Sequence, residues 1–203
     1  MTTQSRPVTD SGSNPTTPLF RKSEWIVDGI DLEYAQEMVR KHHYSKGGSN
    51  TAVYTHGLFS RAAFWQSECV GCAWWLPPTK TAAMAAYPKD WNGVLALSRL
   101  VILPDVPKNA CSFLIRHSMR LIDRRRWPCL LTYADGWRGH TGAIYKAAGF
   151  EKCGTTKPER VYVKNGRMIS RKAGPRTRTH SEMLAIGCEC VGAFSKTRFR
   201  HVV

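Results

Sequence analysis

One stretch of the chain constrains its fold more than any other. The apolar run 130–134 ends at Asp135, and a short helical pattern then leads to Gly149 and Phe150. An apolar run bounded by turn residues favours a buried strand of the parallel type, and Gly149 stands where the end of a helix takes a left-handed residue. Ligands of open α/β sheets bind beyond the carboxyl ends of such strands. We therefore predict an α/β fold with Asp135 at a functional edge.

The balance of charge restricts the partners that this chain can have. Its 203 residues contain 30 Lys and Arg against 15 Asp and Glu, a formal net charge of +15. A basic surface has sequence-independent affinity for phosphates. Nucleic acid is therefore the leading candidate partner, and the length suits one domain with short extensions.

The sequence carries neither a membrane span nor a secretion signal. No run approaches the length that crosses a bilayer, and residues 1–18 lack a charged start followed by an apolar core. We expect a cytoplasmic protein with no membrane partner, whose seven cysteines stay reduced. The pairs Cys69 with Cys72 and Cys188 with Cys190 are zinc-ligand types. Residues i and i+3 of a strand point to opposite faces, which argues against zinc at the first pair.

The composition along the chain predicts one domain with two flanking segments. Residues 1–20 are rich in Ser, Thr, Pro and Asn, so they cannot offset their ordering entropy, and we expect a disordered leader. Residues 21–172 form the predicted domain, of α/β (α+β) class, with a central mixed sheet flanked by helices. Residues 173–203 form a basic C-terminal extension, either a nucleic-acid arm or a partly folded segment that packs on the domain.

Periodicity and turn residues place the elements within this domain. Strands are predicted at 25–27, 51–60, 69–76, 95–103, 130–135, 159–164 and 167–171, and helices at 31–42, from 109 or 111 to 126, and before Gly149. The last two strands flank Asn165-Gly166, a strong hairpin signal. The connection 79–93 is longer than most loops, which makes it a candidate lid or substrate loop.

The helix predicted to reach residue 126 carries a stripe of arginines. Arg116, Arg120 and Arg124 recur at four-residue spacing. A solvated helix face is the ordinary interpretation of such a stripe, and DNA contact is the alternative that the charge of the chain favours. Together with Arg176 and Arg178 of the C-terminal extension, these arginines are the predicted DNA-binding residues.

Two sets of motifs resemble known families. The segment 143–150, Ala-Ile-Tyr-Lys-Ala-Ala-Gly-Phe, resembles the last conserved element of GNAT-type N-acyltransferases. When it is taken with the motifs at 42–44, 97–100, 108–110 and 133–135, the chain resembles the Mom DNA-modification proteins of Mu-type bacteriophages. The resemblance implies a GNAT-like fold. It also implies an enzyme that converts adenine in phage DNA to a carbamoylmethyl derivative at its exocyclic amine and so protects the DNA from host restriction.

The resemblance also assigns residues. It carries catalytic roles to His43, Tyr44, Asp135 and Tyr145, and donor-binding roles to Arg99 and Ser112. Lys108 and Asn109, at the start of a helix, are further donor-binding candidates because a helix N-terminus attracts anions. A solvent-facing helix end is the alternative for His43 and Tyr44.

The chemistry of adenine accounts for these residue types. Its exocyclic amine is a poor nucleophile, so transfer needs a proton acceptor and stabilisation of the developing oxyanion. Asp135 is the candidate acceptor, Tyr145 the candidate donor to the oxyanion or leaving group, and Tyr44 or His43 the candidate holder of the base. The base must be flipped out of the stack or single-stranded. Tyr87, Trp91 and Trp137 are candidate stacking partners, with packing in a core or loop as the alternative.

The donor follows from the segment 105–112, which contains no glycine although acetyltransferases use glycines there to approach phosphates. Coenzyme A is therefore in doubt. A carbamoylmethyl group is an isomer of a glycyl group on the same nitrogen, so we expect an activated glycyl donor, glycyl-tRNA above all, with acyl-CoA as the alternative. His42 and His43 with Asp135 are residue types of an iron site but define no geometry. An acyl-CoA-dependent N-acetyltransferase and a non-enzymatic basic nucleic-acid-binding protein remain alternative functions.

Overall fold

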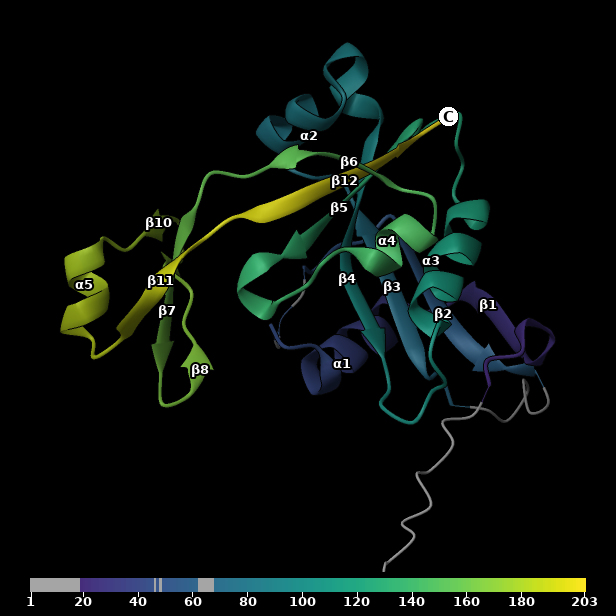
Figure 1. The fold of residues 1–203 in the computed structure, drawn as a ribbon, viewed down its shortest axis with the longest axis horizontal. Helices are drawn as coiled ribbons and strands as arrows, with labels where there is room; N and C mark the ends of the chain where they lie inside the picture. Colours follow the sequence, from purple (N-terminus) through teal and green to yellow (C-terminus); the bar gives the residue numbers. More distant parts are fainter. Residues whose placement is uncertain (1–18, 46, 48, 62–67) are drawn as a thin grey trace, which may run out of the picture.

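A computed structural model describes residues 19–45, 47, 49–61 and 68–203. The predicted disordered leader therefore lies almost wholly outside the described residues. The centre of the molecule is a seven-stranded sheet, ordered β1-β2-β3-β4-β5-β12-β6 (Figure 1). Its strands are β1 (Trp25–Gly29), β2 (Tyr54–Ser60), β3 (Gly71–Leu76), β4 (Val94–Ile102), β5 (Cys129–Asp135), β12 (Lys196–Val202) and β6 (Glu151–Thr155).

Four helices cover the two faces of this sheet. They are α1 (Leu32–His42), α2 (Lys80–Ala86), α3 (Ala110–Leu121) and α4 (Ala143–Ala147). Successive strand residues point to opposite faces: Trp75 packs in the cluster that contains α3 and α4, whereas Trp74 packs against α1. Alternation along β4 and β5 likewise places α2 on the α1 face. In the described part of the chain, no helix is long and apolar enough to cross a membrane.

The sheet opens between β4 and β5, the one parallel pair among its neighbours. Their pairing joins Val94–Ala96 to Cys129–Leu131 and stops there, although both strands continue. The later residues of β4 and β5 therefore border a gap in the sheet. The predicted strand that ends at Asp135 is confirmed, as is the left-handed backbone at Gly149 (φ 99°).

The segment 79–93, predicted as a lid or substrate loop, is helical rather than a loop. Thr79 caps α2, and the 3-10 helix Pro88–Gly93 follows. The missed signal is the run of alanines, two of which, Ala83 and Ala86, are buried against the sheet. Tyr87 and Trp91 pack with this cluster, so they are core side chains and not stacking partners for a base.

The C-terminus is part of the central sheet, which corrects the predicted boundary at 172. β12 pairs with β5 on one side and β6 on the other, and its Phe199 is buried in the main core. Residues 156–195 leave the sheet after β6 and return at β12; we call them the arm. The arm contains β7 (Glu159–Lys164), β8 (Arg167–Met168), β9 (Lys172–Ala173), β10 (Arg176–Thr177), α5 (His180–Ala185) and β11 (Glu189–Phe194).

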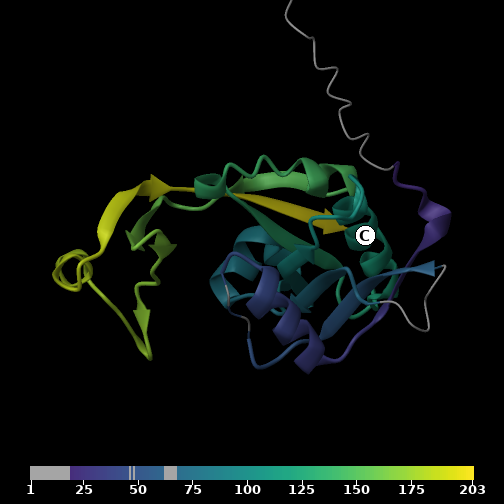
Figure 2. The same ribbon diagram turned by 90° about the horizontal axis from the view of Figure 1, so that it is seen from below.

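The arm projects away from the rest of the molecule, as Figures 1 and 2 show from two directions. β7 pairs with β11 and with β8, and β9 pairs with β10. The predicted hairpin is confirmed: Asn165 and Gly166 join β7 to β8, both with positive φ (51° and 72°) as a two-residue turn requires.

Candidate active site

The gap between β4 and β5 widens into a cleft of about 900 Å³. Its lining includes all four predicted catalytic residues: Asp135, Tyr145, His43 and Tyr44. They come from three separate segments, namely the end of β5, the helix α4 and the loop after α1. The fold therefore brings together side chains that are about 100 residues apart in the sequence.

Asp135 is held by the turn that follows its strand. Its Oδ1 accepts the backbone N–H of Trp137 (3.1 Å), at the start of the 3-10 helix Gly136–Arg138. Lys196 is its Cα partner across the β5–β12 ladder and also lines the cleft. The carboxylate is thus fixed by a backbone hydrogen bond at the mouth of the opened sheet.

Tyr145 is buried in the wall of the cleft. Its hydroxyl donates to the carbonyl of Tyr133 (3.3 Å), and its ring packs against Phe150 and Phe199. Burial raises the pKa of this hydroxyl above its ordinary value. Tyr145 therefore keeps its proton at neutral pH and is a donor rather than a base.

Tyr44 and His43 approach from the loop after α1. Their ring centroids are 4.3 Å apart. The Tyr44 side chain is 41% exposed, yet partial burial and the charge of Asp135 raise the pKa of its hydroxyl. The backbone N–H of Ser45 donates to Nδ1 of His43 (3.1 Å), which places the hydrogen of the neutral ring on Nε2. Both side chains are therefore oriented in the cleft rather than being a solvated helix end.

Two neighbouring residues were not predicted from the sequence. The guanidinium of Arg138 lies over the ring of Tyr44 (4.9 Å) and over that of Trp137 (4.1 Å). The His140 ring meets Tyr44 edge-on at 6.2 Å and lines the cleft. The signal that could have found them is position, because both follow the functional strand end and precede Tyr145.

Arg99 lies in this cleft, apart from the other predicted donor-binding residues. Its Nε donates to the carbonyl of Gly47 (2.8 Å), and another guanidinium nitrogen donates to the carbonyl of Ser98 (2.7 Å). Arg99 therefore ties the loop that follows Tyr44 to β4.

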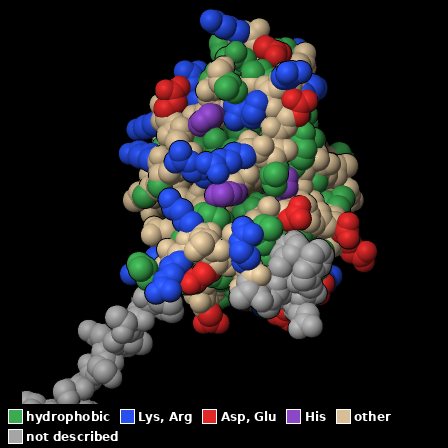
Figure 3. Space-filling model, turned by 90° about the vertical axis from the view of Figure 1, so that its right-hand side faces the viewer, with side chains coloured by type: hydrophobic (Ala, Val, Ile, Leu, Met, Phe, Trp, Pro, Cys, Tyr) green, Lys and Arg blue, Asp and Glu red, His purple; other side chains and the backbone are tan. Residues whose placement is uncertain are grey.

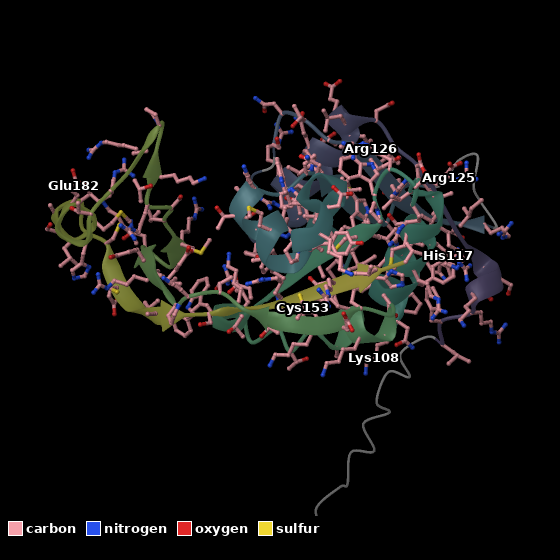
Figure 4. The ribbon with its side chains drawn as sticks, turned by 90° about the horizontal axis from the view of Figure 1, so that it is seen from above. Lys108, His117, Arg125, Arg126, Cys153 and Glu182 are labelled. Atoms are coloured by element: carbon pink, nitrogen blue, oxygen red, sulfur yellow. The ribbon has the colours of Figure 1, made fainter. Side chains whose placement is uncertain are left out.

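A second pocket, of about 830 Å³, lies on the other side of the α3 N-terminus. Asn109 and Ser112 line it, whereas Cys111 lines the first cleft; Lys108 is exposed beside them (Figure 4). Among the residues that the structure describes, its lining contains no carboxylate and holds four cations: Lys22, Arg61, Arg116 and Arg120. Figure 3 shows Lys and Arg gathered with histidines on this side of the molecule. Desolvation and the charges of Arg120, Lys22 and Arg116 lower the pKa of His117. The pocket suits an anion.

Arg124 does not continue the predicted stripe. The helix α3 ends at Leu121, and Asp123 accepts backbone N–H groups of the next turn. Arg124 is directed inward, where it donates to the carbonyls of Pro128 (2.9 Å) and His201 (3.3 Å). Arg124 therefore joins β12 to the turn before β5, and its contact with DNA stays a prediction.

The candidate metal ligands do not gather into one group in the described part of the chain. The described part of the chain contains no group of three His, Cys, Asp or Glu that could hold a metal ion. His42 and His43 line the cleft together with Asp135 and His140, but these residues do not gather into such a group. The cysteine pairs are far from one another as well: Cys69 and Cys72 pack beneath α1, and Cys188 and Cys190 lie in the arm.

The model of the Mom protein family matches residues 24–203, nearly the whole described chain. The chain belongs to the Mom protein family. A distant Mom relative, the methylcarbamoylase mom of Escherichia phage Mu, is 25% identical over 142 residues, or 67% of this chain. The match spans 56% of that protein's length.

Solved structures of acetyltransferases share the fold of this Mom protein. A candidate acetyltransferase of Acinetobacter baylyi superposes with a TM-score of 0.54 at 12% identity, covering 88% of this chain and 92% of that one. The spermidine N-acetyltransferase of Vibrio cholerae gives 0.51 at 10% identity, covering 89% and 96%. These likenesses show the fold, which is GNAT-like, mixed and α+β. The predicted fold and family are confirmed.

Proposed function

We propose that this Mom protein modifies the exocyclic amine of adenine in DNA. The observation that carries the proposal is the gathering of Asp135, Tyr44 and Tyr145 in one cleft at the opening of the sheet. The name of the phage Mu relative, a methylcarbamoylase, supports the class of product, and the net charge of +15 supports a nucleic-acid substrate.

The cleft suits a single base taken out of the duplex. Its volume of about 900 Å³ lies in the range of small-molecule sites. Enzymes that act on bases extrude the target and hold it on aromatic and planar groups. Tyr44, with Arg138 over its ring and His140 at its edge, offers such a platform beside Asp135.

Four side chains of the cleft have separate roles in acyl transfer. Asp135 accepts the proton of the adenine amine as the new bond forms. Tyr145, whose raised pKa keeps it protonated, donates to the oxyanion or to the leaving oxygen. His43 and Tyr44 orient the base.

The donor in this proposal is an activated glycyl ester or thioester. Attack by the amine forms an N–C bond and breaks the bond from the glycyl carbonyl carbon to the carrier oxygen or sulfur, which releases the carrier hydroxyl or thiol. An intramolecular isomerisation then gives the carbamoylmethyl group: the adenine nitrogen exchanges its bond to the carbonyl carbon for one to the methylene carbon, and the glycyl nitrogen exchanges its bond to the methylene carbon for one to the carbonyl carbon. The basic second pocket beside the first cleft would receive a phosphate-bearing carrier. The acceptable carriers are a tRNA end, which holds glycine as an ester, and coenzyme A, which would hold it as a thioester. They are distinguished by incubating purified protein and DNA with glycyl-tRNA or with glycyl-CoA.

The deciding experiment is mass spectrometry of nucleosides from plasmid DNA of cells that express the protein. We expect a deoxyadenosine derivative heavier by a carbamoylmethyl unit. Tyr145→Phe keeps the packing against Phe150 and Phe199 but removes the hydroxyl, so the rate should fall about 10²- to 10⁴-fold. The rate of the Asp135→Asn variant should fall by at least the same factor.

Two outcomes would replace this function with one of the alternatives. Unmodified adenine with acetylation of an amine from acetyl-CoA would indicate an ordinary N-acetyltransferase. DNA binding that survives Asp135→Asn and Tyr145→Phe, with no modified nucleoside in the wild type, would indicate a non-enzymatic binding protein.

A further inference from the structure

The arm is a folded insertion rather than a loose tail. The chain enters the arm from β6 and passes from the arm into β12. These two strands pair with each other, with Thr197 of β12 as the Cα partner of Thr155 of β6. At its base the N–H of Thr156 donates to the carbonyl of Lys196 (2.9 Å), and the N–H of Lys196 donates to the Thr156 hydroxyl (2.9 Å). The main sheet is therefore closed without the arm.

A small core of its own holds the arm in shape. Tyr162, Met183 and Cys188 are buried together, with Ile169 and Cys190 packed against them. The Tyr162 hydroxyl lies 2.8 Å from Nδ1 of His180, and a capping box between Thr179 and Glu182 starts α5. This core is separate from the core of the main domain, so the arm adds an outward surface rather than stability to the active site.

That surface is basic. The arm has three glutamates, at 159, 182 and 189, against eight cations: Lys157, Arg160, Lys164, Arg167, Arg171, Lys172, Arg176 and Arg178. Six of the eight are exposed. Within the arm, all of which the structure describes, Arg176 is the one cation paired with a carboxylate, that of Glu182 (2.6 Å). Like charges gathered on a thin projection repel one another, and binding to a polyanion relieves that repulsion.

The base of the arm lies beside the part of the cleft that contains Asp135. Thr156, Glu159 and Lys196 line the cleft, and Lys196 faces Asp135 across the β-ladder. A Cβ on Gly136, the residue after Asp135, would lie 2.6 Å from the carbonyl of Ser195, so the two segments are in close contact. The second basic pocket is elsewhere: Figure 4 shows Glu182 of the arm and His117 of that pocket at opposite ends of the molecule.

We infer that the arm is a clamp for the phosphate backbone of duplex DNA next to the flipped adenine. This inference rests on the proposed function, because Asp135 marks the side where adenine enters. Arg160 and Lys164 are exposed on one side of β7, four residues and about 13 Å apart, and Arg167 follows the hairpin turn. These cations contact phosphates and not base edges, so the clamp holds any sequence equally.

The test is the salt dependence of binding to a fluorescein-labelled 20-base-pair DNA duplex. The arm variant is Arg160→Gln, Arg167→Gln and Lys172→Gln in the full chain; each residue is exposed and has no carboxylate partner among the described residues. If all three contact phosphates, the slope of log K against log salt falls by about 2 to 3. The Kd should rise at least about tenfold at 0.15 M salt, alike for different sequences.

A matched variant removes three exposed cations outside the arm: Arg40→Gln, Lys89→Gln and Arg125→Gln. It should keep the slope and Kd of the wild type. Equal slopes for the wild type and the arm variant would overturn the clamp. Arm-dependent binding that is much tighter for an RNA duplex than for the DNA would overturn DNA as its occupant.

Activity on a short single-stranded oligonucleotide separates this inference from the proposed function. A clamp for duplex leaves that activity of the arm variant near the wild-type rate, while Asp135→Asn abolishes it. Loss of activity on the short substrate, with an unchanged thermal unfolding temperature, would show that the arm shapes the cleft and would overturn the clamp. If no protein modifies either substrate but the slopes differ as expected, the proposed function fails and the arm still binds DNA.

Discussion

At the scale of single residues, a buried polar trio lies beneath α3. The Ser118 hydroxyl accepts from Nε1 of Trp75 (2.6 Å) and lies 2.6 Å from Nδ1 of His56. Its single hydrogen is then best donated to an unprotonated Nδ1, and burial lowers the pKa of His56 to about 4. The ring is held neutral, so this serine and histidine are a structural pair rather than a nucleophile and its base.

This trio predicts a loss of stability in acid. The unfolded state binds a proton to His56 near pH 6.5, while the folded state does so near pH 4, so the stabilisation is present above pH 6.5 and is lost as the pH falls toward 4. This shift in the pKa of His56 corresponds to about 3 kcal/mol of unfolding free energy. Urea unfolding between pH 7.5 and 4.5 measures it. His56→Gln should be less stable at neutral pH but show a flatter dependence on pH.

Two other histidines of the described residues contribute to the pH dependence of stability that remains in His56→Gln. His117 and His201 also have lowered pKa values, with burial as the largest cause and nearby arginines adding to it. His117→Gln is the matched control, since it removes an imidazole outside the trio and should keep most of the pH dependence. A slope for His56→Gln equal to that of the wild type would show that His56 is not buried in its neutral form.

At the scale of elements, two glycines set the short helix α4. Gly142 precedes it with φ 79° and Gly149 follows it with φ 99°, a region that side chains with a Cβ avoid. A Cβ on Gly142 would also overlap the ring of Phe199 in β12. Because Tyr145 is on this helix, the contact between Gly142 and Phe199 fixes where the hydroxyl points.

Gly142→Ala should therefore cost about 2–4 kcal/mol of unfolding free energy, from both the left-handed backbone and the overlap with Phe199. Gly139→Ala is the matched control: its φ is 69°, but no atom lies within 4 Å of the added Cβ, so the cost should be about 1 kcal/mol. Urea denaturation of the three proteins gives both values. Equal losses would mean that the Phe199 contact has no energetic weight.

At the scale of the whole molecule, the last strand belongs to the central sheet, whereas the arm lies outside it. β12 lies between β5 and β6 and carries the buried Phe199, whereas the arm has its own small core. The C-terminal thirty residues are therefore not one extension: they contain a piece that the fold needs and a piece that it does not.

This distinction predicts the fate of two shortened chains. A chain that ends at residue 172 loses β12, leaves β5 and β6 without their shared partner, and should show no cooperative unfolding transition. Replacing 157–195 by Asn-Gly joins Thr156 to Lys196, which are already hydrogen-bonded, and should leave a folded protein. Circular dichroism during heating distinguishes them. A cooperative transition in the first chain would contradict the place of β12 in the core.

Local patterns were sufficient where the physics is local. The apolar run to Asp135, the helix of Tyr145 and the turn at Asn165-Gly166 were predicted because strand periodicity and positive φ depend on neighbours in the chain. They were also enough to name four side chains that lie in one cleft, once the resemblance to the Mom family was recognised.

Only the tertiary structure decided the contacts between distant segments. Nothing near Phe199 in the sequence indicates that its strand inserts between β5 and β6, because strand pairing is chosen by partners about 45 to 70 residues away. Arg124 has the same spacing as Arg116 and Arg120, yet it is directed inward since α3 ends before it. A sequence displays which groups a chain possesses and its local backbone preferences, whereas the direction each group faces depends on packing between elements.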